Sequence, residues 1–433
     1  SRGESFFTTL LLLNSSSSMA LSASLAETEE KNIIFRFQEY LRINTVQPTP
    51  DYRAAAAFLL SQAQSISLES QSIEFVEGKK IVLLKWIGSD PSLPAILLNS
   101  HIDVVPYEED KWDHPPLGAE IDEEGKIYAR GAQDMKSVGM QYLEAIRKLK
   151  ASGFKPRRSV YVTFVPDEEI GGADGVGQFV ESEIFKSLNI AVVLDEGLPS
   201  ETGIYRVFNG ERMPWSLKIK AVGQPGHGSK LYDNSAAENL TKSIESMMMF
   251  RASQFDQLKA GLKPDGGVIS VNMVFLKAGT PSPDGFVMNL QPSEAEAGFD
   301  IRIPPTADLV ALERRLVEEW APSVRNMSFE LQRYDQKLSG KQLLTAKDDS
   351  IPWWGLLENA VNAAGGRISE PEIFPASTDS RYFRKAGLPA IGFSPISNTP
   401  SLLHDHNESL SQSEYLKGID MYVSIIKAFT SYP

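Results

Sequence analysis

Short apolar runs alternate with helical periods along most of this 433-residue chain, and this alternation constrains its fold more than any other feature. The runs are roughly the length of buried strands, and the stretches between them carry the spacing of amphipathic helices. Strand and helix in alternation indicate an α/β fold with a mostly parallel sheet. The expected strands are KIVLLKWIG, PAILLNS, SVYVTFV, NIAVVL and PAIGFS, and the expected early helices are NIIFRFQEYL and DYRAAAAFLLSQAQ.

Residues 210–336 break this alternation. Their pattern is strand, helix, two strands, helix and strand, which is the order of a ferredoxin-like unit with both helices on one face of an antiparallel sheet. The segment IPWWGLLENAVNAAGG then resumes the earlier pattern. We therefore expect a main α/β domain formed by residues 29–209 and 337–433, with a smaller α+β domain inserted at 210–336.

The first 28 residues differ from the rest. FFTTLLLL followed by NSSSSMALSASLA has the short apolar core and small-residue tail of a signal peptide. The alternative is that translation starts at Met19 and the preceding residues are a non-native or disordered leader. We expect a cytoplasmic protein, or a secreted one if the apolar stretch is a signal. No apolar run approaches the roughly 18 residues that span a bilayer.

Charge and cysteine content exclude several classes of function. The formal net charge is −13, and no cluster of lysine and arginine offsets it, so nucleic acid and anionic membranes are not expected partners. The chain has no cysteine, which excludes disulfides, thiolate metal sites and a cysteine nucleophile. Any bound metal must therefore be held by histidines and carboxylates.

Metal-type ligands follow the expected strands at the points where they end. In open α/β sheets the loops after the carboxyl ends of the strands form the crevice where ligands bind. The polar residues at these ends are His101, Asp103, Asp167, Glu168, Glu169, Asp195 and Glu196. Asp134 precedes a helical pattern, and His404 and His406 lie in a late loop.

Each of these residues has a simpler interpretation when taken alone. Asp134 could be a helix cap, Glu168 and Glu169 a solvated turn, and His101 a core histidine. Their convergence favours a metal site, because several acids and histidines in one crevice would repel or go unpaired without a cation. A sulfur-free set of histidine and carboxylate ligands suits zinc, or cobalt and manganese as substitutes.

Seven motifs, in chain order, resemble the co-catalytic zinc metallopeptidase family of aminoacylases and exopeptidases. They are SHIDVVP, YARGAQDMK, VPDEEIGG, LDEG, QPGHGS, STDSRY and LLHDHNE. The resemblance runs from about Glu29 to the end of the chain, and RGAQDMK, LDEG and LLHDHNE are similar to the aminoacylase branch.

This resemblance implies two zinc ions and a zinc-peptidase-like catalytic domain. The implied ligands are His101, Asp134, Glu169, Glu196 and His404. Asp134 would bridge the ions, His101 and Glu196 would complete one, and Glu169 and His404 the other. Asp103 would orient the imidazole of His101. Glu168 would be the general base, while His406 and Asp195 receive no ligand role.

The resemblance also implies an N-acyl-L-amino acid as substrate and a homodimer formed through the inserted lid domain. Arg381 and Arg302 are candidates to hold the substrate carboxylate, with Asn289 as a polar neighbour. His227 in QPGHGS would reach the active site of the partner subunit and stabilise the oxyanion. The alternatives are a dipeptidase or carboxypeptidase on the same metal centre, or a catalytically inactive binding protein with this fold.

Overall fold

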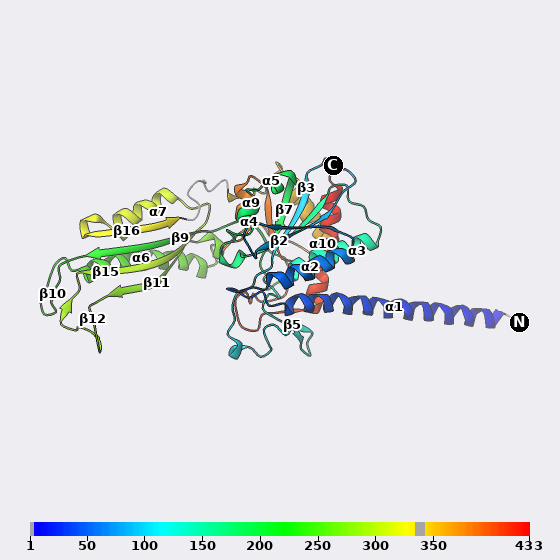
Figure 1. Cartoon of the computed structure of the whole chain (residues 1–433), viewed down its shortest axis with the longest axis horizontal. Coiled ribbons are helices and arrows are strands. Elements are labelled where there is room, and N and C mark those ends of the chain that lie inside the picture. The colour runs from blue at the N-terminus through cyan, green and yellow to red at the C-terminus, as the bar shows by residue number, and fades with distance from the viewer. Residues whose placement is uncertain (1–3, 334–342) are drawn as a thin grey trace. The chain divides into compact units, whose positions relative to one another are not determined.

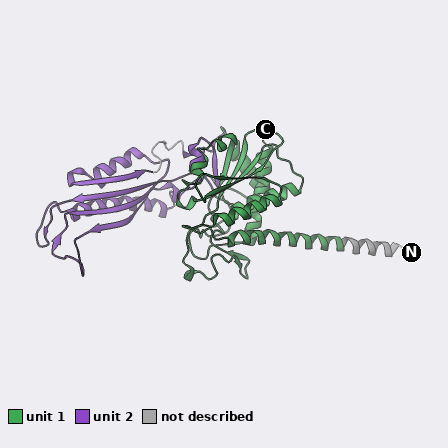
Figure 2. Cartoon of the chain, in the orientation of Figure 1, with its two compact units in different colours: residues 1–206, 349–369, 393–433 green, residues 207–348, 370–392 purple. Residues whose placement is uncertain are grey.

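The computed structural model describes residues 4–333 and 343–433, with side chains described from residue 16 onward. These residues form two compact units, which Figure 2 colours separately. The first unit comprises Ser1–Arg206, Asp349–Ser369 and Phe393–Pro433, and the second comprises Val207–Asp348 and Glu370–Gly392. The expected domain boundary between residues 336 and 337 lies outside the described residues.

The first unit contains a mixed sheet whose central strand, β3, is buried along its whole length. Five of its eight strands lie in the order β1 (Glu69–Glu74), β2 (Lys80–Trp86), β6 (Val160–Val165), β3 (Ala95–His101) and β7 (Ile190–Asp195). β3 runs parallel to both β6 and β7, whereas β2 runs antiparallel to β1 and β6. In this register His101 pairs with Val165, so the segments that follow β3 and β6 leave the sheet at the same edge.

The helices of the first unit are α1 (Glu4–Arg42), α2 (Tyr52–Ser65), α3 (Lys136–Ala151), α4 (Val176–Phe179), α5 (Glu183–Ser187), α8 (Trp353–Ala363) and α10 (Gln412–Ser431). Of these, α2, α3 and α10 pack on the sheet, whereas α1 packs against α3 (Figure 1). Tyr142 of α3 meets Tyr422 of α10 edge to face, with ring centroids 4.8 Å apart. A small antiparallel sheet joins β4 (Glu120–Ile121), β5 (Lys126–Tyr128) and β19 (Ser409–Ser411).

The second unit contains the expected ferredoxin-like arrangement. Its four-stranded sheet has the order β11 (Ser270–Ala278), β15 (Glu294–Ile303), β9 (Met213–Val222) and β16 (Met327–Arg333), with every neighbouring pair antiparallel. Alternate residues of β9 are buried in the unit's core. One face of this sheet is covered by α6 (Ala236–Lys259) and α7 (Leu309–Arg315). α7 continues as a π-helical turn to Trp320, whose ring lies 5.3 Å from that of Phe250 of α6, measured between ring centroids.

Shorter elements complete the second unit. They are β8 (Val207–Glu211), β10 (Gly226–His227), β12 (Pro281–Ser282), β13 (Gly285–Phe286), β14 (Leu290–Gln291), β17 (Glu372–Phe374), α9 (Ser380–Lys385) and β18 (Ala390–Phe393), whose last residue belongs to the first unit. β17 runs parallel to β8, and β10 pairs antiparallel with β14. The α/β class, the mixed sheet and the four-stranded antiparallel sheet of the second unit confirm the predicted fold.

The N-terminal stretch forms the long helix α1, labelled in Figure 1. Its side chains are exposed from residue 16 to residue 32, and its buried side chains begin at Ile33. Residues 1–3 and the side chains of residues 4–15, where the apolar part of the expected leader falls, lie outside the described residues, so the nature of this leader stays a prediction. Over the described part of the chain, no helix combines the length and the apolar character that crossing a membrane requires.

Candidate metal centre

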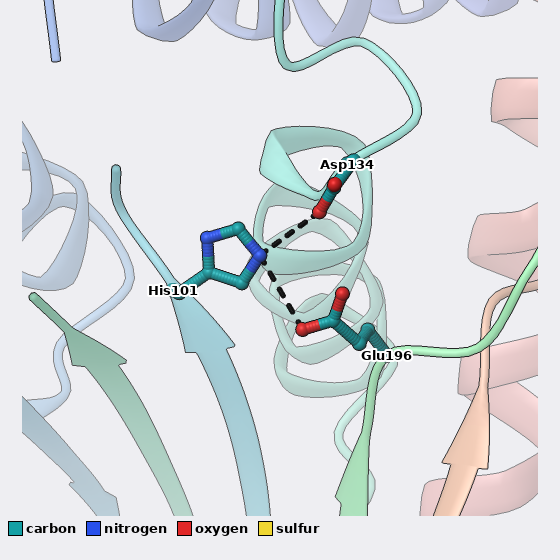
Figure 3. Close-up of side chains that lie close together, drawn as sticks. All are labelled: His101, Asp134 and Glu196. Carbon is teal, nitrogen blue, oxygen red and sulfur yellow. Dashed lines mark hydrogen bonds and ion pairs between the residues drawn. The ribbon is translucent and has the colours of Figure 1, made fainter. Parts of the chain in front are cut away.

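His101, at the carboxyl end of β3, is the centre of the first group of ligand-type side chains. Its Nε2 atom lies 2.9 Å from Asp134 Oδ1 and 3.3 Å from Glu196 Oε2. Figure 3 shows the ring directed at both carboxylates, which come from the loop before α3 and from the end of β7. Nδ1 of His101 lies 2.8 Å from the carbonyl oxygen of Asp103, which only accepts, so Nδ1 carries the proton of the neutral ring. Nε2 then has the lone pair that a metal needs.

Asp134 also takes part in a second group, with Glu169 and His404. His404 Nε2 lies 3.2 Å from Asp134 Oδ2 and 3.2 Å from Glu169 Oε2. One oxygen of Asp134 therefore faces His101 while the other faces His404. In each group the ligand-type atoms all lie within 4.8 Å of one another. A carboxylate shared in this way is suited to bridge two cations.

The charges of this cluster fit a cation. Burial, reinforced by the Asp134 carboxylate, raises the pKa of Glu169 to about 8, and burial also raises the pKa of Glu196. Hydrogen bonds to Asp134 and Glu169 raise the pKa of His404 to about 10. Protons thus offset the crowded carboxylates, and a metal ion would displace them.

Two buried oxygens support the same conclusion. Among the described residues, Glu169 Oε1 has no hydrogen-bond partner, and Glu196 Oε2 has none beyond its 3.3 Å contact with His101 Nε2. An unsatisfied buried carboxylate oxygen is costly unless a cation coordinates it. The donor set, which contains nitrogen and oxygen but no sulfur, fits zinc or a similar divalent ion.

The carboxylate of Glu408 holds the loop that presents Asp134. Glu408 Oε2 accepts hydrogen bonds from the backbone N–H groups of Gly131, Gln133 and Asp134, at 3.1, 2.7 and 3.1 Å. Its other oxygen lies 3.1 Å from Arg130 Nη1. Asp134 is therefore fixed by a residue far along the chain, and α3 begins just after it, at Lys136. The sequence motif LLHDHNE contains Glu408, but nothing in its spacing indicates this contact.

Asp103 lies between His101 and the turn at Glu168 and Glu169. Its carboxylate oxygens accept the backbone N–H groups of Glu168 at 3.1 Å and of Glu169 at 3.0 Å. The nearest of these oxygens to His101 Nδ1 is 3.5 Å away, so the short contact to the ring comes from the Asp103 carbonyl. Asp103 therefore positions the two glutamates as well as the histidine.

The other acids at the strand ends point elsewhere. Asp167 accepts a hydrogen bond from Tyr52 and pairs with Lys79, and Asp195 accepts one from Asn99. Neither belongs to a group of ligand-type side chains in the described residues. Glu168 Oε2 lies 3.4 Å from His101 Nε2, and Glu168 forms a third group of ligand-type side chains with His101 and Glu169.

The residues expected to recognise substrate lie in the second unit and have partners there. Arg302 makes two hydrogen bonds to Asp300, at 2.7 and 3.1 Å. Arg381, which is mostly buried, lies 3.8 Å from Glu211 and stacks on Tyr382.

His227 and Asn289 are neighbours in the second unit, and both are exposed. The carbonyl of Asn289 accepts the N–H of Gly228, which follows His227, at 2.8 Å. Nδ1 of His227 accepts the N–H of Ser229 at 3.1 Å, so the neutral ring carries its proton on Nε2. Nε2 of His227 is thus a hydrogen-bond donor.

Known proteins with a similar sequence cover almost the whole chain. Residues 97–428 match the family described as Peptidase family M20/M25/M40. Aminoacylase-1 of Mus musculus is 44% identical over 409 residues, which are 94% of this chain and 97% of that protein. Aminoacylase-1 of Dictyostelium discoideum is 44% identical over 410 residues, 93% of this chain and 98% of that protein. The chain belongs to peptidase family M20/M25/M40.

A solved structure from the M20 family has the same fold. The M20 family metallo-carboxypeptidase from Sulfolobus solfataricus matches with a TM-score of 0.68 over 92% of this chain and 99% of that one. The two sequences are 17% identical, so this similarity supports the fold of the present chain but says nothing about its substrate.

Proposed function

We propose that this M20 chain hydrolyses N-acyl-L-amino acids to a carboxylate and a free L-amino acid. The observation that carries the proposal is the near full-length identity of 44% to aminoacylase-1, in a chain that brings together three overlapping groups of ligand-type side chains. Two zinc ions held there would polarise the acyl carbonyl and lower the pKa of the attacking water. We assign His101 and Glu196 to one ion, Glu169 and His404 to the other, and Asp134 to both.

The proton transfers fall to Glu168. Its carboxylate accepts a proton from the attacking water as the oxygen–carbon bond forms, and it delivers that proton to the amide nitrogen as the carbon–nitrogen bond breaks. Asp103 supports this role because it holds the backbone of Glu168 and Glu169 in one turn, at 3.1 and 3.0 Å. One glutamate can then coordinate while its neighbour moves protons.

The test is hydrolysis of N-acetyl-L-methionine by metal-loaded and chelated protein, with the released amino acid quantified and the metal content measured. We expect turnover that is lost on chelation and restored by zinc. A parallel panel of dipeptides decides the alternative, because faster release from a dipeptide would make the protein a peptidase. Metal-loaded protein that turns over neither class would be a binding protein.

We further propose that the second unit serves as a lid and dimerises. β11 is an edge strand of its sheet and exposes Met273, Val274 and Leu276, at 39, 65 and 59% of their surface. Exposed apolar side chains on an edge strand favour pairing with a second strand. In such a dimer His227 would donate from Nε2 to the oxyanion in the partner's site.

Subunit mixing tests this assembly. Inactive His227→Asn and inactive Glu168→Gln subunits, mixed and allowed to exchange, should regain activity through heterodimers that hold one intact composite site. No recovery after verified exchange would place His227 outside catalysis or in its own subunit's site.

A further inference from the structure

A buried cluster of polar side chains surrounds the two aspartates next to the Glu168–Glu169 turn. The Nε2 amide of Gln47 donates to Asp103 Oδ2 at 3.0 Å and to Asp167 Oδ1 at 3.1 Å. The hydroxyl of Tyr52 donates to Asp167 Oδ1 at 2.6 Å and accepts the Asp167 N–H at 2.9 Å. Gln47 and Tyr52 are 6 and 5% exposed, so water does not substitute for these contacts.

Both aspartates in the cluster are directly connected to the Glu168–Glu169 turn. Asp103 accepts the N–H groups of both glutamates, and Asp167 directly precedes Glu168 in the chain. A single amide group thus bridges the two carboxylates that border the turn on either side. An ionised carboxylate only accepts hydrogen bonds. The amide NH2 group of Gln47 has two donor hydrogens, so it can donate one hydrogen bond to each aspartate without adding a charge.

The backbone at Asp167 shows why such a cluster is needed. Asp167 has φ of +63°, in the left-handed region that non-glycine residues seldom adopt. A residue keeps such a conformation only where several independent contacts hold it in place. Tyr52 bonds both the side chain and the backbone of Asp167, and Gln47 adds a third contact.

We propose that Gln47 and Tyr52 are positioning residues, which act through Asp103 and Asp167 to hold the turn carrying Glu168 and Glu169. The consequence for catalysis rests on the proposed function, in which Glu168 transfers protons. The consequence for the turn's rigidity does not, and it can be measured without any substrate.

The first measurement is amide hydrogen exchange over the peptide that contains Glu168 and Glu169. In Gln47→Met this peptide should exchange markedly faster, because the Asp103 carboxylate that its amides bond has lost a donor. The matched control is Gln38→Met, which removes a part-buried glutamine amide bonded to the Ala119 carbonyl at 2.9 Å. Unchanged exchange at the turn in Gln47→Met overturns the proposal, whether or not the protein is an aminoacylase.

The second measurement is steady-state kinetics at saturating zinc with the metal content verified. Loss of a residue that orients an active-site group costs about ten- to a hundredfold in activity, and we expect Gln47→Met to lower kcat by this factor with little change in KM. In the Glu168→Gln background the same change should lower kcat less than threefold, since the group it positions is already lost. A fully multiplicative effect would contradict action through Glu168.

Tyr52→Phe keeps the test decisive if Gln47→Met does not fold, since it removes one oxygen atom and preserves the ring. It should raise exchange at the turn and lower kcat in the same sense. Its control is Tyr415→Phe, because the buried Tyr415 hydroxyl has no hydrogen-bond partner within the described part of the chain. Equal behaviour of the two tyrosine variants would overturn the role of Tyr52. Inactive wild type with a loosened turn in Gln47→Met would instead refute the proposed function alone.

Discussion

The ligand-type cluster of the first unit and the candidate recognition residues of the second unit are organised in opposite ways. Apart from His404, whose side chain is 54% exposed, the cluster is buried, and Asp134 and the Glu168–Glu169 turn are held through their own backbone N–H groups. In the second unit, His227 is exposed and Arg302 is paired with Asp300.

This difference indicates which functions each unit can perform unaided. A cluster held by backbone hydrogen bonds is preorganised, so it needs little rearrangement to bind a cation or move a proton. A guanidinium that already has a carboxylate partner must exchange or share it when a substrate arrives. Under the proposed function, the chemistry would depend on fixed groups of the first unit, and recognition on groups of the second unit that already have partners.

The largest expected effect tests the fixed side of this comparison. Glu168→Gln should lower kcat by about two to four orders of magnitude, the usual loss for a positioned general base. Its metal content should stay that of the wild type, measured by elemental analysis after gel filtration.

Glu169→Gln is the matched control, because it changes the neighbouring residue of the same turn. It should lose metal, since Glu169 Oε2 lies 3.2 Å from His404 in the second ligand group. Metal loss in Glu168→Gln with retention in Glu169→Gln would exchange the two roles.

The next effect tests the recognition side. A charged hydrogen bond to a substrate carboxylate contributes about 1.5–3 kcal/mol, so Arg381→Ala should lower kcat/KM by about ten- to a hundredfold. The N-acyl amino-acid amide lacks that carboxylate, so its slow hydrolysis should barely change.

Arg381 also lies 3.8 Å from buried Glu211, whose carboxylate accepts hydrogen bonds from Thr378. Arg381→Ala therefore needs a melting curve beside the kinetics. Equal losses on acid and amide would mean that Arg381 supports the fold, and Arg302 would become the better candidate.

Local patterns predicted the fold and the places of most cluster residues. His101 ends an apolar run that forms β3, and Glu196 follows one that forms β7, so strand periodicity alone locates both at one sheet edge. The roles assigned to them in metal binding and catalysis stay predictions.

The contacts that hold the cluster could not be predicted in this way. Glu408 bonds the N–H of Asp134 across 274 positions, and Gln47 bonds Asp167 across 120. Hydrophobic periodicity reports which face of an element is buried, but not which distant polar group meets it there. Buried polar contacts of long sequence separation therefore emerged only from the structure.

The third prediction concerns pH and the metal. His404 has a raised pKa of about 10, so its contribution to the stability of metal-free protein is full below its ordinary 6.5 and is lost toward pH 10. The pKa of Glu169 is raised to about 8, so burying this acid lowers the free energy of unfolding by a growing amount as pH rises from 4.5 to 8. Both shifts make the metal-free protein less stable as pH rises from 6.5 to 8.

Melting curves of chelated and zinc-loaded protein over this range check the prediction. The stabilisation by zinc should grow with pH, because each proton that the metal displaces strengthens binding about tenfold per pH unit. A gap between the two melting temperatures that stays constant with pH would show that these groups do not exchange protons for metal.

The smallest effect compares the two units by equivalent helix caps. Ser235 accepts the N–H of Glu238 at the start of α6 in the second unit, and Ser411 accepts the N–H of Glu414 at the start of α10 in the first, both at 3.2 Å. Either serine-to-alanine change should lower the free energy of unfolding by about 1 kcal/mol.

Calorimetry then compares the two units. If the metal cluster stabilises the first unit alone, Ser411→Ala should lower the temperature of the same calorimetric transition that chelation lowers. Ser235→Ala should then lower a transition that chelation leaves in place. If both variants lower the temperature of one common transition, the two units unfold together. The metal cluster would then stabilise the recognition residues of the second unit as well.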